Sequence, residues 1–305
     1  MPGVNYARRF FALLALLRRE TDAEHALDAA EIARRLREQE GLSVDPRSVR
    51  RTVAEMKAAG LPVDDAHRIC WLGHFSPGET EYLMQAVAFG YGLTEADRQK
   101  LIGKILSLAD RRPEPPASLP ARPGNPRTLH TLTVLRRAMA QGRQVAFHYG
   151  ARDADGALSP RLRRGDSGLP KVYNAHPYAL VMNSGRPYLV AAVNRHAGLS
   201  HYRVDRILDV RLRKAPIRPL ARPLDPALYP LRHPYMYAGP VRRYRLRVDR
   251  GHLNDVLDWF GTGVTLENPT RETVEAEVLC DAASMGIWLR RYGVHARVME
   301  AGEEK

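Results

Sequence analysis

Near the N-terminus, basic side chains alternate with apolar ones at a spacing that suits binding to a charged partner. Asp45 is a favourable helix N-cap, and Pro46 fits the first helical position, where its missing N–H costs no hydrogen bond. Val49, Val53 and Met56 then recur at helical spacing, which predicts a buried face. The other side of this helix carries the residues that we predict to contact DNA: Arg47, Ser48, Arg50, Arg51, Thr52 and Lys57. Arginine can bond both O6 and N7 of guanine, and it can also neutralise a phosphate.

The elements expected around this helix are those of a DNA-reading domain. Asp28 predicts an earlier N-cap, with Glu31 completing a capping box. Short apolar runs at residues 61–63 and 69–72 predict a small hairpin after the basic helix. A capped helix, a tight turn, a basic helix and a hairpin together predict a winged helix-turn-helix in residues 1–75. The alternative is a basic but solvated helix in an unrelated bundle.

The excess of positive charge is confined to the middle of the chain. The whole sequence has 47 Lys and Arg against 34 Asp and Glu, a net charge of +13. Residues 125–222 hold 18 basic and five acidic side chains, whereas the segments on either side are close to neutral. This concentration predicts a polyanionic partner for the middle block, with a merely solvated basic surface as the alternative. Because residues 1–75 carry 12 basic and 11 acidic side chains, one copy should bind DNA weakly, which favours a homodimer.

Two proline-rich stretches divide this α+β chain into several domains. Residues 111–126 contain six prolines and almost no large apolar side chain, so they cannot make a packed element. Beyond them, a helix and several short strands predict a small β-barrel, and the last segment reads strand, helix, two strands, helix, strand. The expected divisions are a winged helix-turn-helix (1–75), a helical connector and linker (76–126), a barrel (127–215), a second linker (216–240) and an α/β domain (241–305).

Other classes of protein find little support in the sequence. Cys70 and Cys280 lie far apart, which predicts two reduced thiols rather than a disulfide or a zinc site. The apolar run Phe10–Leu17 is too short to span a membrane and is followed by charged residues rather than a signal cleavage site, so we expect a cytoplasmic protein. The sequence contains no phosphate-binding loop, nucleophile elbow, zinc-protease or dinucleotide-binding motif. We therefore expect no enzymatic activity, no cofactor and no bound metal.

Several motifs, in order along the chain, resemble the WYL-domain transcription regulators. Val44–Leu72 resembles the winged helix-turn-helix of that family, and Gly185–Ala191 resembles its name-giving strand, with Pro187-Tyr188-Leu189 in the place of Trp-Tyr-Leu. Tyr202–Ile207 is similar to the family's Phe-Arg-Leu-Asp-Arg-Ile motif, and Trp288–Gly293 resembles its C-terminal WCX extension. Pro187 departs from the family pattern. Proline cannot donate to a sheet ladder, so we expect an edge or a bulge there.

The resemblance implies an SH3-like or Sm-like barrel in the middle and a ferredoxin-like α/β extension at the C-terminus. It also implies a basic and aromatic pocket in the barrel for an anionic nucleotide or nucleic-acid ligand. Motif positions place these residues in or beside that pocket: Tyr149, Tyr188, Arg203 and Arg206, with His148, Arg195 and Tyr202 as weaker candidates. The arginines would pair with phosphates, and the tyrosines would stack on bases. Alternatively, Asp205 could hold Arg206 in an ion pair, and Tyr188 could simply fill the barrel.

Taken together, the residues and the resemblance predict a homodimeric transcription regulator that binds a double-stranded operator, acts as a repressor and is controlled by the barrel's ligand. Members of the family act in phage defence and in DNA-damage responses. The alternative from the charge distribution is an RNA- or single-strand-binding accessory protein that works through the basic barrel. Arg47, Arg50 and Arg51 separate the two, because only the regulator needs them for binding.

Overall fold

A computed structural model describes residues 2–109, 114–163, 165, 168–193 and 198–303. The chain falls into two compact units, the first made of residues 1–89 and 95–120 and the second of residues 90–94 and 121–305. Helices and strands occur in both units, so the fold is α+β, as predicted. None of the helices in the described ranges combines the length and the apolar character needed to cross a bilayer.

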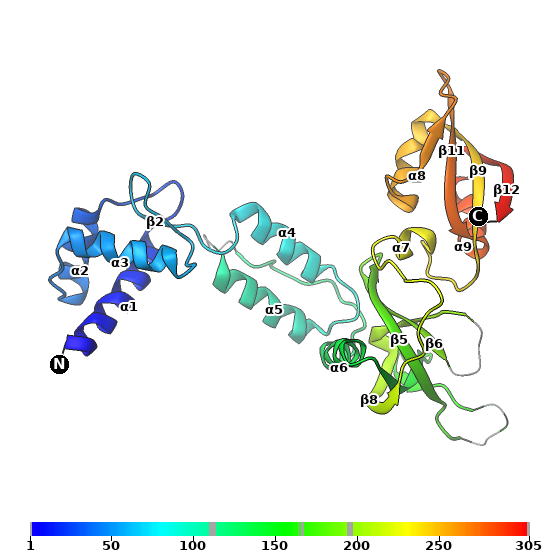
Figure 1. Ribbon diagram of the computed structural model, residues 1–305, viewed down its shortest axis with the longest axis horizontal. Helices are drawn as coiled ribbons and strands as arrows, with labels where there is room; N and C mark the ends of the chain where they lie inside the picture. Colours follow the sequence, from blue (N-terminus) through cyan, green and yellow to red (C-terminus); the bar gives the residue numbers. More distant parts are fainter. Residues whose placement is uncertain (1, 110–113, 164, 166–167, 194–197, 304–305) are drawn as a thin grey trace. The chain divides into compact units, whose positions relative to one another are not determined.

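Three helices and a hairpin form the N-terminal part of the first unit (Figure 1). They are α1 (Pro2–Glu20), α2 (Ala29–Glu40), α3 (Pro46–Ala58), β1 (Val63–Asp64) and β2 (Cys70–Trp71). Asp28 and Asp45 cap α2 and α3 as predicted, each accepting a backbone N–H at 2.8 and 2.7 Å. The second half of the capping box predicted at Glu31 is wrong, because the Glu31 carboxylate binds Arg34 and Arg35 instead of the N-cap. Apolar residues from α1, α2, α3 and the hairpin share one core.

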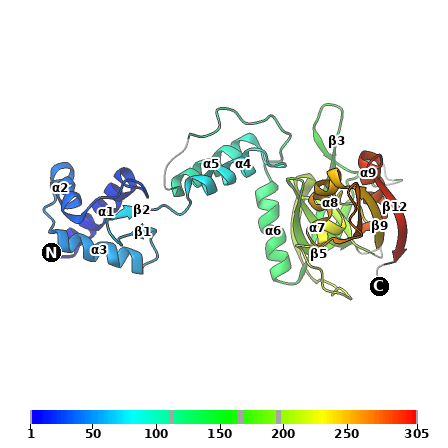
Figure 2. The ribbon, with the colours of Figure 1, turned by 90° about the horizontal axis from the view of Figure 1, so that it is seen from above.

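Helices α4 (Pro77–Ala88) and α5 (Glu95–Leu108) follow as a hairpin, side by side in both views (Figures 1 and 2). Ser76 and Glu79 form a full capping box at the start of α4. Arg98 of α5 is buried, and its guanidinium donates to the carbonyls of Ala88 and Pro120, each at 2.9 Å. The carbonyls at the end of α4 are the negative end of its dipole, so they compensate part of the cost of burying this cation.

The second unit contains a curled antiparallel sheet against which α6 (Thr128–Ala140) packs (Figure 2). Its strands are β3 (Arg143–Arg152), β4 (Leu158–Pro160), β5 (Val172–Asn183), β6 (Arg186–Val193), β7 (Ser200–Arg203) and β8 (Ile207–Pro216). Strands β3, β5, β6 and β7 form a meander, β8 returns to pair with β3, and β4 pairs with the far end of β3. The barrel predicted from the strand spacing therefore appears here as a sheet that curls back on its first strand.

Two details of this sheet bear on the sequence motifs. The single strand predicted at residues 201–213 is wrong in its middle, where a 3₁₀ turn, η1 (Val204–Arg206), separates β7 from β8. This turn carries the chain from a strand paired with β6 to one paired with β3. Pro187 pairs with Met182 of β5, and the ladder to β7 begins only at Tyr188. Pro187 therefore has no partner on β7 that would need its N–H. This agrees with the edge position expected for it.

The segment predicted as a second linker contains a short helix, α7 (Tyr229–Arg232), and buried side chains. Nδ1 of His201 lies 2.8 Å from the Met236 carbonyl, which can only accept, so Nε2 accepts from the Tyr229 hydroxyl at 2.8 Å. Burial is the main reason that the pKa of His201 is lowered to about 4. His233 lies 3.3 Å from the Asp281 carboxylate, so this segment joins the curled sheet to the C-terminal domain.

The C-terminal domain has the predicted order of strand, helix, two strands, helix and strand. It comprises β9 (Val241–Asp249), η2 (Arg250–His252), α8 (Leu253–Phe260), β10 (Thr265–Glu267), β11 (Thr273–Asp281), α9 (Ala282–Tyr292) and β12 (Ala296–Glu303). The sheet order is β10-β11-β9-β12, and both helices contribute to one core on one face of it. The other face carries arginines of β9 paired with glutamates of β10 and β11.

Candidate nucleic-acid interface and sensor site

Helix α3 separates its apolar and basic side chains as the sequence predicts. Val49, Val53 and Met56 are 0% exposed and belong to the core shared with α1 and α2. The six predicted DNA contacts lie on the remaining surface, with Arg47, Arg50, Arg51 and Lys57 exposed and Ser48 and Thr52 half-buried. The apolar face holds α3 against the core. The helix therefore keeps its position without any contact made by the basic side chains.

The arginines of α3 are held by few internal contacts. Among the described residues, Arg47, Arg50 and Arg51 form no ion pair and donate no side-chain hydrogen bond. Lys57 differs, because its Nζ lies 2.7 Å from Asp65 Oδ1 in the turn between β1 and β2. Three exposed guanidinium groups on one helix are therefore available to an external anion.

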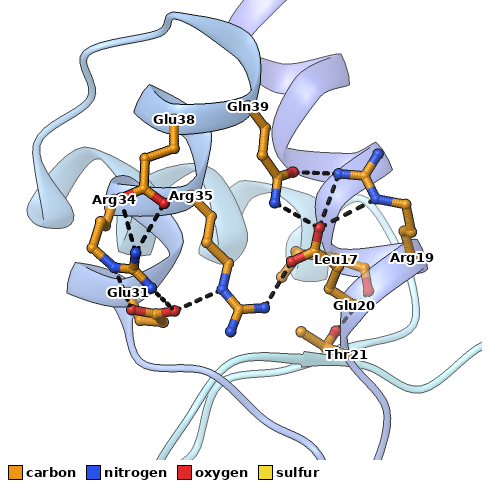
Figure 3. A network of polar contacts seen from close by, with 9 residues as sticks. All are labelled: Leu17, Arg19, Glu20, Thr21, Glu31, Arg34, Arg35, Glu38 and Gln39. Carbon is orange, nitrogen blue, oxygen red and sulfur yellow. Dashed lines mark hydrogen bonds and ion pairs between the residues drawn. The ribbon is translucent and has the colours of Figure 1, made fainter.

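The arginines of α2 are arranged differently, in a network of ion pairs (Figure 3). Arg34 binds Glu31 and Glu38, with N–O distances of 2.7 and 2.8 Å. Arg35 binds Glu31 at 2.6 Å and reaches Glu20 at the end of α1 at 2.7 Å. Hydrogen bonds from Arg34 and Arg35 lower the pKa of Glu31 to about 2. Both cations are neutralised within the molecule, and Arg35 also joins α1 to α2.

In the second unit, a cluster of aromatic rings lies where the predicted ligand residues meet. Tyr149 and Tyr202 pack edge to face, with centroids 5.1 Å apart, and Tyr173 and Phe147 complete the group. Tyr149, Tyr173 and Tyr202 are each 8% exposed. Burial raises the pKa of Tyr202 to about 12, so its hydroxyl remains protonated at neutral pH. Rings buried to this degree fill the core of the sheet and offer no free face on which a base could stack.

Arg203 stands beside this cluster and is tied to Asp205. Its Nε and Nη2 donate to the two Asp205 carboxylate oxygens at 3.0 and 2.7 Å, and its backbone N–H donates to the Tyr149 hydroxyl at 3.1 Å. The Arg203 side chain is 19% exposed and that of Asp205 only 3%. Asp205 thus pairs with Arg203 rather than with Arg206, which forms no ion pair within the described part of the chain.

The comparison with protein families covers this same region. Residues 130–212 match the model of the WYL domain. The chain contains a WYL domain. All seven predicted ligand residues fall inside this range: Tyr149, Tyr188, Arg203, Arg206, His148, Arg195 and Tyr202.

Among solved structures, one match is proteasome accessory factor B/C (PafBC) of Arthrobacter aurescens. The identity is 16%, the TM-score is 0.30, and the match covers 96% of this chain and 44% of PafBC, so this chain spans less than half of that protein's length. No curated protein matches the sequence.

The remaining predicted residues of the WYL domain have unequal positions. Tyr188 is half-buried on β6 and is paired directly with Arg203 of β7. Nδ1 of His148 lies 3.0 Å from the Lys171 carbonyl. Arg195 lies outside the described residues. In the described ranges, no three His, Cys, Asp or Glu side chains come together as a metal site.

Two basic residues of the WYL domain were missed by the sequence reasoning. The Arg161 guanidinium lies 5.4 Å from the centre of the Tyr149 ring, and Lys171 Nζ lies 4.8 Å from that of Tyr173. Both side chains are exposed, and the backbone N–H of Lys171 donates to the Arg161 carbonyl at 2.7 Å. The only sequence signal for them was the general excess of basic residues in this block, because their proximity depends on backbone hydrogen bonds between residues 161–163 and 169–171. With Arg203 and Arg206 they form what we call the sensor cluster: Arg161, Lys171, Arg203 and Arg206.

Proposed function

We propose that this chain is a WYL-type transcription regulator that binds duplex DNA through α3 and senses a phosphate-containing ligand through the sensor cluster. In this proposal residues 1–75 are a winged helix-turn-helix, the curled sheet is an SH3-like or Sm-like barrel, and residues 241–305 are a ferredoxin-like WCX extension. The observation that carries the proposal is that α3 exposes three arginines, which have no ion-pair partner among the described residues, while it buries its apolar face. A major-groove helix needs this arrangement, because its base-reading side chains must be free.

The ligand half of the proposal rests on charge and burial. Arg161, Lys171 and Arg206 have no ion-pair partner among the described residues, and they lie near the buried rings of Tyr149 and Tyr173. Phosphate oxygens suit such a group of donors. Since Tyr149 and Tyr202 are buried, we revise their role from stacking on bases to supporting the cluster and donating hydrogen bonds. The ligand is bound and not turned over, and the functional form is a cytoplasmic homodimeric repressor.

Selection of genomic fragments tests the DNA-binding half. Purified full-length protein is mixed with fragmented genomic duplex, and the retained fragments are sequenced. We expect a small set of enriched sites that is lost in the variant Arg47→Ala/Arg50→Ala/Arg51→Ala. The matched control is Arg34→Ala/Arg37→Ala on α2, which removes two exposed arginines from the neighbouring helix and should retain the same sites. Absence of any site enriched over the α3 variant, even in low salt, would exclude the proposal.

A single-strand- or RNA-binding accessory role is the second candidate, because residues 125–222 carry the whole net charge of the chain. It predicts that the α3 variant binds nucleic acid as well as the unmodified protein does. Replacing Arg161 and Lys171 by alanine would then abolish binding to single strands. The same two sets of variants therefore separate the two functions.

A further inference from the structure

The segment Gly90–Thr94 connects α4 to α5, yet it belongs to the second compact unit and is held there by several contacts. The Tyr91 N–H donates to the Gly185 carbonyl at 2.9 Å, at the turn between β5 and β6. The Gly92 carbonyl accepts from the Asn125 N–H at 3.1 Å and from the Thr128 hydroxyl at 2.7 Å. A loop with so many specific contacts is a docked element rather than a passive connection.

The Tyr91 ring adds a second kind of contact. The guanidinium carbons of Arg122 and Arg186 lie 3.9 and 3.8 Å from its centre. A guanidinium over an aromatic face is attracted by the charge distribution of the ring, so both contacts favour this position of Tyr91. Both partners belong to the second unit, so the ring anchors the segment to the sensor domain.

Gly92 rests directly on Asp205, the partner of Arg203. Its φ is +89°, and a Cβ at this position would lie 2.8 Å from the Asp205 Cβ. The Asn125 side-chain amide, whose own backbone N–H holds Gly92, donates to the carbonyls of Asp205 and Ile207 at 3.1 and 3.3 Å. One buried asparagine, Asn125, thus joins the backbone around η1 to the segment Gly90–Thr94.

We propose that Gly90–Thr94 is a latch seated on the Arg203–Asp205 pair, and that a phosphate which draws Arg203 away from Asp205 releases this latch. The inference rests on the proposed function, since it concerns the same sensor cluster. Asp205 is 2% exposed and has Arg203 as its ion-pair partner. Removing the cation would leave a buried carboxylate without a counter-charge, which is strongly destabilising unless the carboxylate reaches water. Gly92 lies against the Asp205 side chain, where a Cβ would be 3.8 Å from Oδ2, so we infer that Gly92 moves when the carboxylate reaches water.

The connection to DNA binding follows from the chain itself. The latch is continuous with the last turn of α4 on one side and the first turn of α5 on the other. Its seated and released states therefore set different constraints on the two helices that follow the DNA-binding part. A ligand that favours one state shifts the equilibrium by its difference in affinity for the two.

Hydrogen exchange of the full-length protein tests the latch, with 5′-phosphorylated pentathymidylate as the probe. In the unmodified protein the Tyr91 amide should be protected, and saturating probe should speed its exchange at least tenfold. Arg203→Ala and Arg203→Met each leave the buried Asp205 carboxylate without its counter-charge, so both should show the fast exchange without probe. Gly92→Ala should do the same. Gly103→Ala is the matched control, because a Cβ at that exposed helical position meets no atom within 4 Å, and it should behave as the unmodified protein.

The outcomes separate this inference from the proposed function. If the probe binds, as measured by fluorescence anisotropy, while Tyr91 exchange is unchanged or slower, the latch is wrong and ligand binding stands. If the probe does not bind, the ligand half of the proposed function fails. The folded Arg203→Ala and Arg203→Met variants then decide about the latch. Slow Tyr91 exchange in both of them overturns it. Circular dichroism identifies a variant that is unfolded, in which case the other one is used.

Discussion

Helices α2 and α3 are neighbours with similar numbers of arginines, but they use them in opposite ways. On α2, Arg34 and Arg35 are bound to glutamates of the same helix and of α1 (Figure 3). On α3, Arg50 and Arg51 are exposed and have no ion-pair partner among the described residues. The number of basic residues is thus a poor guide to binding, and the carboxylates around them decide which cations are available.

The largest effect is expected from removing the free arginines. Arg50→Ala/Arg51→Ala should weaken binding to a selected operator by about 30-fold or more, because each base contact contributes roughly 1–3 kcal/mol. If one of them contacts a phosphate instead, the slope of log K against log salt should become shallower by about 0.9. Titrations at several salt concentrations measure both quantities. Arg34→Ala should leave affinity and slope unchanged, and an equal loss in that variant would remove the distinction between the helices.

A smaller effect on stability is expected from the paired arginines. Arg35→Ala removes the bridge between Glu31 and Glu20 and should lower the free energy of unfolding of the N-terminal domain by about 1 kcal/mol, with little effect on operator affinity. Urea unfolding followed by the fluorescence of Trp71, which is buried in the same domain, reports the change. Unaltered stability together with weaker DNA binding would mean that α2 also contacts the duplex.

Lys57 is the ion-paired cation of α3, and a substitution at its partner can make it resemble the unpaired arginines of the same helix. Asp65→Asn should remove the nearer partner of its ammonium group, leaving only Asp64 at 3.9 Å, and raise operator affinity about two- to threefold, in line with the small energy of exposed ion pairs. The same titration as above measures it. Reduced affinity would show that the Lys57–Asp65 pair itself positions the hairpin for binding.

The smallest expected effect is a pH dependence that belongs to α2 alone. Arg34 and then Arg35 lower the pKa of Glu31 to about 2, below its ordinary value of 4.5. The resulting stabilisation is complete above pH 4.5 and is lost as the pH falls from about 4.5 towards 2. In Glu31→Gln this part of the acid destabilisation should be missing from melting temperatures measured across that interval. An unchanged acid profile would mean that the network contributes nothing.

Local structure was largely predictable from the sequence, because it depends on residues close together in the chain. The caps at Asp28 and Asp45 and the buried face of α3 follow from spacing alone, and so does the element order of the C-terminal domain. Pro187 also fits its position. A proline is unfavourable inside a sheet because it lacks one N–H donor, and residue 187 has no partner on β7 to which it would donate.

Pairings between distant residues were not predictable in the same way. Asp205 could equally have paired with Arg206, and only the 3₁₀ turn directs it to Arg203. Arg161 and Lys171 reach the tyrosines because residues 161–163 pair with residues 169–171, and no motif predicts this pairing. The docking of Gly90–Thr94 also depends on glycines that allow another backbone segment to approach closely. At Gly124, a Cβ would lie 2.5 Å from the Leu93 carbonyl oxygen.

The position of His201 has a practical consequence for anyone who cuts this protein into fragments. A sensor fragment that stops at residue 215 would lack Tyr229 and Met236, which supply both partners of the imidazole and part of the apolar cluster around Val181 and Val190. The His201 ring would then lack both hydrogen-bond partners, and part of the apolar cluster beside it would be missing. A fragment meant to fold by itself should therefore extend beyond residue 236, although the proline-rich composition of that stretch invites an earlier cut.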